Sequence, residues 1–256
     1  MADYARDSRV IFDLGMNNGD DAAFYLSRGF TVVALDANPA LCERAQGRFR
    51  AAVDEGRLTI LNAAIWEKTG EATFYVNLDN DHWSSLDIGW AGREGTQYKE
   101  IAVRCVTLSD LFGEFGVPHY LKIDVEGADH SVLEQLCSNS LLPLYVSVED
   151  CRFGFQYLEL LASCNYNGFK LLDQSSVSNM KDSITGRVFS AGSSGPFGSD
   201  LPGEWRSHEE IVGLYSATVR DHDGKRLAPR TRWWDIHCTH VGSARTISAQ
   251  PQARTL

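Results

Sequence analysis

The stretch Val10-Ile11-Phe12-Asp13 is a short apolar run that ends in an acid. Three further runs have the same form: residues 32–36, 120–124 and 145–149, which end in Asp36, Asp124 and Glu149. Unbroken runs of this length, rich in β-branched residues, are typical of strands buried on both faces of a parallel sheet. Strand-like and helix-like segments alternate along the chain, which predicts a doubly wound α/β sheet with right-handed crossovers.

The four acids at the ends of these runs indicate what the sheet binds. Ligands of open α/β sheets lie in the crevice beyond the carboxyl ends of the strands. We therefore expect the four carboxylates along one edge of one crevice. Carboxylates there repel phosphate groups, and they attract hydroxyl groups, ammonium groups and a sulfonium. This arrangement favours S-adenosylmethionine over a nucleotide phosphate.

The composition of the chain narrows the class of protein. The 256 residues carry a net charge of −10, which argues against a nucleic-acid partner. Basic residues gather between Arg220 and Arg232, and we interpret them as a solvated surface. The N-terminus lacks the apolar core of a signal peptide, and no apolar run approaches the roughly 20 residues of a membrane span. The six cysteines have no metal-binding spacing, which predicts apolar fillers in a reducing, cytoplasmic compartment.

One domain is expected over residues 1–242, with its cofactor-binding half at about residues 9–150. Residues 174–205 are rich in Ser, Gly and Pro, and a loop of that length in a compact domain is often a functional lid. The polar stretch 77–98 is also expected to be a loop. Apolar and polar residues alternate over residues 234–239, which predicts a half-exposed late strand. Residues 243–256 lack periodicity and are expected to be a disordered tail.

A glycine-rich turn, residues 13–19, follows the first apolar run. Asp36 stands after its last glycine at about the interval at which an acid binds ribose hydroxyls, an interval that NAD would also satisfy. Two details favour S-adenosylmethionine over NAD. Asn17 replaces the middle glycine that lets a pyrophosphate approach, and Asp20 and Asp21 occupy the helix N-terminus that would hold phosphate. A helix cap on a domain that binds no cofactor is the structural alternative.

Residues 122–126, Lys-Ile-Asp-Val-Glu, place three ionisable groups at the end of a buried strand. Strand alternation puts Lys122, Asp124 and Glu126 on one side, where they are costly unless paired or functional. One interpretation is an ion pair between Lys122 and Asp124. The other is a polar floor, in which Asp124 or Glu126 contacts the acceptor hydroxyl or the methionyl ammonium and acts as the base. Glu149, one strand over, is expected to bind the acceptor.

With these segments in hand, the chain resembles the FkbM-type family of S-adenosylmethionine-dependent methyltransferases. The matching segments are residues 12–20, 30–39, 62–65, 84–86, 106–110 and 121–128, which lie between about residues 9 and 150. The most specific is Leu121-Lys-Ile-Asp-Val-Glu-Gly-Ala128. Asp129, which follows it, stands where the family often has Glu. The region after Leu172 matches only loosely, so the acceptor is not defined.

The resemblance implies a class I methyltransferase fold, which is Rossmann-like and has a mostly parallel seven-stranded sheet with a late antiparallel strand. It also implies roles for single residues. Asp13, Gly15, Asn17 and Gly19 would hold the methionine part of the cofactor. Asp36 would bind the ribose, and Ala64 and Ser85 would lie near the adenine. Asp124 is both a cofactor residue and, with Glu126 and Glu149, a catalytic candidate.

The implied reaction is O-methylation of a hydroxyl group on a sugar, a glycan or a small natural product. We expect a monomer or homodimer with no nucleic-acid partner and no membrane span. No metal site is predicted, and the need for a divalent metal stays open. Two alternatives stay open: a nicotinamide-dependent oxidoreductase, and a cofactor-binding partner module without catalysis.

Overall fold

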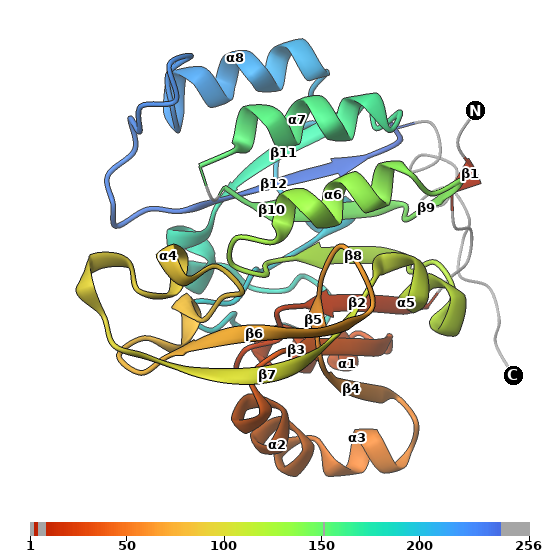
Figure 1. Cartoon of the computed structure of the whole chain (residues 1–256). Helices are drawn as coiled ribbons and strands as arrows, with labels where there is room; N and C mark the ends of the chain where they lie inside the picture. Colours follow the sequence, from red (N-terminus) through yellow and green to blue (C-terminus); the bar gives the residue numbers. More distant parts are fainter. Residues whose placement is uncertain (1–2, 5–8, 151, 242–256) are drawn as a thin grey trace, which may run out of the picture.

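A seven-stranded sheet lies at the centre of the computed structural model, which describes residues 3–4, 9–150 and 152–241 (Figure 1). The strand order is β11-β12-β10-β8-β2-β3-β4. The strands are β2 (Val10–Leu14), β3 (Thr31–Asp36), β4 (Leu58–Asn62), β8 (Tyr120–Ile123), β10 (Tyr145–Glu149), β11 (Gly168–Asp173) and β12 (Trp234–Thr239). β12 is antiparallel to both neighbours, and all other pairs are parallel. The predicted mostly parallel sheet with a late antiparallel strand is confirmed. The predicted tail, 243–256, lies outside the described residues.

Helices cover both faces of this sheet (Figure 1). On one face are α1 (Asp20–Ser27), α2 (Pro39–Arg48) and α3 (Arg50–Asp54), and on the other α5 (Leu108–Phe115), α6 (Asp129–Cys137), α7 (Gly154–Ser163) and α8 (His208–Thr218). Ile11 packs with α1, whereas Phe12 and Leu14 pack on the opposite face, because successive strand residues point in opposite directions. Because helices cover both faces of the sheet, its strands are apolar on both sides, which explains the unbroken apolar runs in the sequence. Every helix in the described ranges is too short or too polar to cross a bilayer.

Strand β12 differs from the prediction of a half-exposed strand. It lies between β10 and β11, and its polar residues Asp235 and His237 are buried together with Ile236 and Cys238. A strand inside a sheet that is covered on both faces has no solvent side. The alternation of polar residues therefore does not mark exposure here.

A second, three-stranded sheet of order β5-β7-β6 consists of β5 (Ala64–Ile65), β6 (Gly70–Asn77) and β7 (Tyr98–Val106). The polar stretch between β6 and β7 was expected to be a loop. It contains α4 (Ile88–Ala91) and the short 3-10 helices η1 (Asp81–Trp83) and η2 (Arg93–Gly95). The side chain of Asp87 accepts from the backbone N–H groups of Gly89 and Trp90 and caps α4. This stretch, residues 78–97, is called the α4 segment below.

The Ser, Gly and Pro-rich residues 174–205 pack beside α1 and include η3 (Gln174–Asn179) and η4 (Gly198–Asp200). Val177, Phe189, Phe197 and Leu201 are buried in the cluster that α1 joins. The ring of Phe197 stacks on Tyr120 of β8 with centroids 4.4 Å apart. These apolar residues cover the part of the sheet face that α1, α2 and α3 leave free. The role of the segment as a lid stays a prediction.

Two of the cysteines are linked. Cys137, at the end of α6, and Cys164, just after α7, form a disulfide, although 27 residues separate them. The prediction that the cysteines are only apolar fillers is wrong for this pair, because the packing of α6 on α7 brings them together. Cys42, Cys105 and Cys238 are free and buried. The remaining short strands, β1 (Asp3–Tyr4) and β9 (Leu141–Leu142), pair in parallel.

Candidate active site

A pocket opens at the carboxyl ends of β2, β3 and β8. Of the residues expected to bind the cofactor, five line it: Gly15, Asn17, Asp36, Ala64 and Asp124. Glu126 lines it as well, and its apolar wall includes Leu41, Phe74 and Leu86. The strand ends thus bring together residues that lie more than a hundred positions apart in the sequence, as Gly15 and Asp124 do.

The turn after β2 has a conformation that only glycine allows. Gly15 has a φ of +82°, and a Cβ placed there would lie 1.8 Å from the carbonyl oxygen of Asp124. The backbone N–H groups of Gly15 and Met16 both donate to the carbonyl of Leu35, at 2.9 and 3.0 Å. The turn is therefore held against both neighbouring strand ends, and its backbone forms one wall of the pocket.

Asp36 ends β3 and faces the glycine turn. Its Oδ2 accepts from the backbone N–H of Asn17 and its Oδ1 from that of Asn38, both at 2.8 Å. Burial raises the pKa of this carboxyl to about 6, although the two N–H donors oppose the shift. Each carboxylate oxygen can accept more than one hydrogen bond. The oriented group is thus suited to accept from vicinal hydroxyl groups in the pocket.

Lys122 lies among three carboxylates at the base of the pocket: Asp13 and Asp21 are buried, and Asp124 is half-exposed. Its Nζ lies 3.1 Å from Oδ1 of Asp13, 3.5 Å from Oδ2 of Asp124 and 3.6 Å from Oδ2 of Asp21. It also donates to the carbonyl of Gly15 at 3.0 Å. Burial alone would lower the pKa of Lys122, but the three carboxylates outweigh it and raise the pKa well above its usual range. The predicted ion pair with Asp124 is present, and Asp124 lines the pocket as well.

Three residues expected to contact the cofactor lie behind the pocket walls. Asp13 is fully buried against Lys122. Gly19 precedes α1, and a Cβ there would lie 2.7 Å from the ring of Phe49. Ser85 is buried and its Oγ donates to the carbonyl of Glu126 at 2.5 Å. These contacts shape the turns around the pocket, and direct contact of the three residues with a cofactor stays a prediction.

The three catalytic candidates meet at one place. Carboxylate oxygens of Asp124, Glu126 and Glu149 lie within 4.8 Å of one another. Glu149 also stands opposite Asp235 in the pairing of β10 with β12. Burial, reinforced by Asp124 and Glu126, raises the pKa of Glu149 well above its usual range. Carboxylates at this spacing also have the ligand chemistry of a divalent cation, so the predicted absence of a metal stays a prediction.

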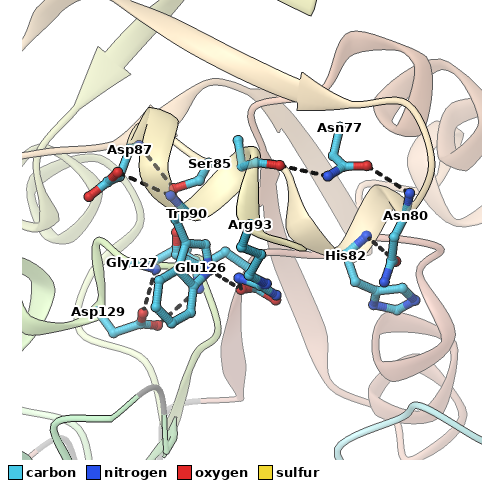
Figure 2. A network of polar contacts seen from close by, with 12 residues as sticks. Asn77, Asn80, His82, Ser85, Asp87, Trp90, Arg93, Glu126, Gly127 and Asp129 are labelled. Carbon is cyan, nitrogen blue, oxygen red and sulfur yellow. Dashed lines mark hydrogen bonds and ion pairs between the residues drawn. The ribbon is translucent and has the colours of Figure 1, made fainter. Parts of the chain in front are cut away.

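Two side chains of the α4 segment contact the carboxylate of Glu126, as Figure 2 shows. Trp90 donates from its indole Nε1 to Oε2 of Glu126, and Nη1 of Arg93 lies 3.1 Å from the same oxygen. Burial, followed by the charge of Asp124, raises the pKa of Glu126 to about 7, while Arg93 and Trp90 oppose the shift. A carboxyl group with a pKa near neutrality is suited to proton transfer.

Asp129 closes the turn that carries Glu126 (Figure 2). Its two carboxylate oxygens accept from the backbone N–H groups of Val125 and Gly127, both at 3.0 Å. Glu126 itself has a φ of +47°, which is uncommon for a residue with a side chain. The residue that departs from the family pattern therefore has a structural role in orienting the catalytic candidate.

Sequence patterns did not reveal several residues of this site. Trp90 and Arg93 contact Glu126 across 36 and 33 positions, and Asp81 and His82 line the pocket from a stretch that looked like a solvated loop. Asp235 joins the acids through strand pairing. A polar stretch with Trp and Arg residues is the only local signal, and it is typical of exposed loops as well.

Comparisons with known proteins were made for the whole chain. A model of the methyltransferase FkbM domain matches residues 13–171. The solved structures that match include methyltransferase FkbM from Methylobacillus flagellatus KT, 16% identical over 65% of this chain and 41% of that one, with a TM-score of 0.43. The chain thus spans less than half the length of that protein. No curated protein matches the chain.

Two further matches cover most of both chains. A precorrin-6y C5,15-methyltransferase from Geobacter metallireducens GS-15 is 9% identical over 91% of this chain and 81% of that one, with a TM-score of 0.40. An O-methyltransferase from Bacillus cereus, solved in complex with SAH, is 12% identical over 91% and 74%, with a TM-score of 0.30.

The family match includes both sides of the pocket, from the glycine turn and Asp36 to Asp124, Glu126 and Glu149. With the strand order described above, it confirms the predicted class I methyltransferase fold. The chain belongs to the FkbM methyltransferase domain family, whose cofactor is S-adenosylmethionine.

Proposed function

We propose that the protein transfers the methyl group of S-adenosylmethionine to a hydroxyl group of a sugar, a glycan or a small natural product. One observation carries the proposal. A single crevice has the oriented carboxylate of Asp36 and the Gly15 turn on one side, and Asp124 and Glu126 on the other. These are the groups that a ribose, a methionine moiety and an acceptor hydroxyl require.

The residues that line the pocket suit each part of the cofactor. Asp36 would accept from the ribose hydroxyl groups, and the Gly15 turn would enclose the methionine part. Asp124, at the end of the pocket near Lys122, would accept from the methionyl ammonium. Ala64 and the apolar wall described above would contact the adenine. More buried carboxylates than cations surround this site, and this balance favours a cofactor that carries a sulfonium.

Glu126 is the proposed base. Bound S-adenosylmethionine supplies an electrophilic methyl group. The carboxylate of Glu126 would accept the proton of the acceptor hydroxyl as its oxygen takes the methyl group, so that the S–CH3 bond breaks and S-adenosylhomocysteine and a methyl ether are the products. Proton transfer by a positioned group contributes about 10²- to 10⁴-fold to a rate. Glu149 and Asp235, whose pKa values burial and neighbouring carboxylates raise well above their usual range, would contact the acceptor. These groups would also orient the acceptor, and this orientation would supply the remainder of the rate enhancement.

We also propose that the protein is cytoplasmic, acts as a monomer or homodimer and has no nucleic-acid partner. The net charge of −10 argues against a nucleic-acid partner. The size of the pocket suits a small-molecule ligand.

Two measurements test the proposal. Calorimetric titration compares binding of S-adenosylmethionine with binding of NAD, and only the former is expected to bind. Transfer of a tritiated methyl group into pools of sugars, glycans and metabolites is then followed with the wild type and with Glu126→Gln. Binding of NAD alone would favour the oxidoreductase. Cofactor binding without transfer into any pool would favour the non-catalytic module.

A further inference from the structure

The mouth of the site lies between two segments that are distant in sequence. One is the α4 segment, and the other is residues 219–233, which connect α8 to β12 at the same end of the sheet (Figure 1). Nη1 of Arg230 lies 3.1 Å from Oε1 of Glu94 and joins the two segments. Glu149 ends β10 between them. These two segments are called the rim of the site below.

The arginines of these two segments each have a carboxylate partner. Arg220 contacts Asp150 at 3.2 Å, and Arg232 contacts Asp173. The expectation that the basic run is simply a solvated surface is therefore wrong for Arg220, which is buried. These pairs anchor the connection to the strand ends, so their charges are already compensated.

Arg152 differs from these arginines. It is exposed, and within the described ranges no carboxylate lies within salt-bridge distance of its guanidinium. The group instead lies over the indole ring of Trp90, 4.3 Å from the ring centre. The backbone of Arg152 has a φ of +92°. Strained backbone in a residue with a side chain clusters at binding sites, where the surrounding structure maintains it.

Arg93 lies over the same indole ring. Its guanidinium is 4.5 Å from the ring centre of Trp90 and 4.5 Å from that of Trp83. Two guanidinium groups on one ring repel each other, and among the described residues Glu126 is the carboxylate that forms an ion pair with Arg93. The charge of Arg152 therefore has no carboxylate partner within the described ranges.

We propose that Arg152 and Arg93, held on the ring of Trp90, form a subsite for an anionic group of the acceptor: a carboxylate, phosphate or sulfate. The planar guanidinium presents paired N–H donors that match such oxyanions. Trp90 reaches from Glu126 to Arg152, so the anion and the methylated hydroxyl are separated by about the width of an indole ring. This spacing places both groups on one sugar unit or on adjoining ones. The inference rests on the proposed function, and it names acidic sugars as the substrate class.

Matched sugars test the charge of the acceptor. Glucuronate, glucose 6-phosphate and neutral glucose are titrated calorimetrically into the protein saturated with S-adenosylhomocysteine. We expect at least one anionic sugar to bind about tenfold more tightly than glucose, the size of effect that a charge-assisted hydrogen bond gives. The carboxylate and phosphate arms show which oxyanion the subsite prefers. Arg152→Gln should remove the preference, whereas Arg152→Lys should retain part of it.

The control is Arg50→Gln, because Arg50 is exposed on α3, away from the rim, and should leave the preference unchanged. Binding of S-adenosylhomocysteine is measured for every variant and should not change. Equal binding of anionic and neutral sugars, no binding of either anionic sugar, or a preference that survives Arg152→Gln would overturn the subsite. A protein that binds no S-adenosylhomocysteine at all would instead contradict the proposed function.

Discussion

The cofactor side and the acceptor side of this site are built in different ways. On the cofactor side, the Gly15 turn and Asp36 are held by backbone N–H and carbonyl groups of adjoining strand ends. On the acceptor side, Glu126 is held by the side chains of Trp90 and Arg93 from the α4 segment. Backbone contacts follow from the sheet itself, whereas side-chain contacts depend on how an inserted segment packs. The first side therefore suits a common cofactor, and the second can vary with the acceptor.

The two sides also differ in charge. Lys122 compensates Asp13, Asp21 and Asp124 beneath the cofactor pocket. Glu149 and Asp235 lie among other acids, and the pKa values of both are raised well above their usual range by burial and by neighbouring carboxylates. Stability is thus expected to depend on the ion pairs of Lys122, and proton transfer on Glu126 and the acids beside it. The following experiments test that division.

The largest effect is expected from Lys122→Met. The substitution leaves the buried carboxylates of Asp13 and Asp21 without their cation, and breaking a buried ion pair costs about 3–5 kcal/mol of unfolding free energy. Urea unfolding of the two proteins at pH 7 measures the difference. Lys99→Met, at an exposed position on β7, is the control and should change little. A loss below about 1 kcal/mol would show that water screens this cluster.

Glu126→Gln should lower kcat about a hundredfold, because the amide cannot accept the proton of the acceptor hydroxyl. The variant should remain folded, and its affinity for S-adenosylmethionine should stay near that of the wild type. Glu71→Gln, at an exposed position on β6, provides the matched control. A variant with wild-type kcat would remove Glu126 from the chemistry and direct attention to Asp124.

The pH dependence separates activity from stability. The pKa of Glu126 is raised from 4.5 to about 7 in the folded protein, chiefly by burial. The rate should therefore rise with pH and level off above about pH 7, where the base is ionised. The folded state binds more protons than the unfolded state between these two values, so stability should fall as pH rises through that window.

Glu126→Gln should flatten the fall in stability and remove the rise in rate. The comparison uses unfolding curves and kcat/KM values, which are measured for both proteins from pH 4 to pH 9. A rate that does not change across this window would exclude Glu126 as the titrating base.

Asp36→Asn tests the cofactor side. The amide loses the charge that strengthens hydrogen bonds to ribose hydroxyl groups, and its NH₂ end opposes a backbone N–H of Asn17 or Asn38. The affinity for S-adenosylmethionine should fall about tenfold, in line with the loss of a charged hydrogen bond. Titration calorimetry measures it, with Asp54→Asn on the exposed side of α3 as the control. An unchanged affinity would place the ribose elsewhere.

The smallest effect is expected from Trp90→Phe, which keeps a ring but removes the N–H donor to Glu126. The indole N–H lowers the pKa of Glu126, so its loss should move the midpoint of the pH–rate profile upward. The rate at pH 7 should fall by about three- to tenfold, the value of one ordinary hydrogen bond. Trp205→Phe, at a ring that stacks on Tyr145 on the opposite face of the sheet, serves as the control. A lower rate with an unmoved midpoint would mean that Trp90 acts only through packing.

The comparison of the two sides also explains which features the sequence revealed. Unbroken apolar runs indicated β2, β3, β8 and β10, because a strand covered on both faces must be apolar throughout. The interval from the glycine turn to Asp36 is a property of one strand–helix–strand unit, so it was visible locally. By contrast, β12 was expected to be half-exposed, because a pattern of alternation does not show whether a strand lies at the edge or inside the sheet.

Contacts between distant segments were decided by the tertiary structure alone. Trp90 reaches Glu126, Arg152 stacks on Trp90, and Cys137 joins Cys164 because separate segments pack together in space. No periodicity or spacing encodes these pairings, since each depends on the relative placement of whole elements. Strands, turns and the acids that end them follow from short-range preferences of the chain, whereas the environment that sets the pKa of Glu126 exists only after the α4 segment has packed over it.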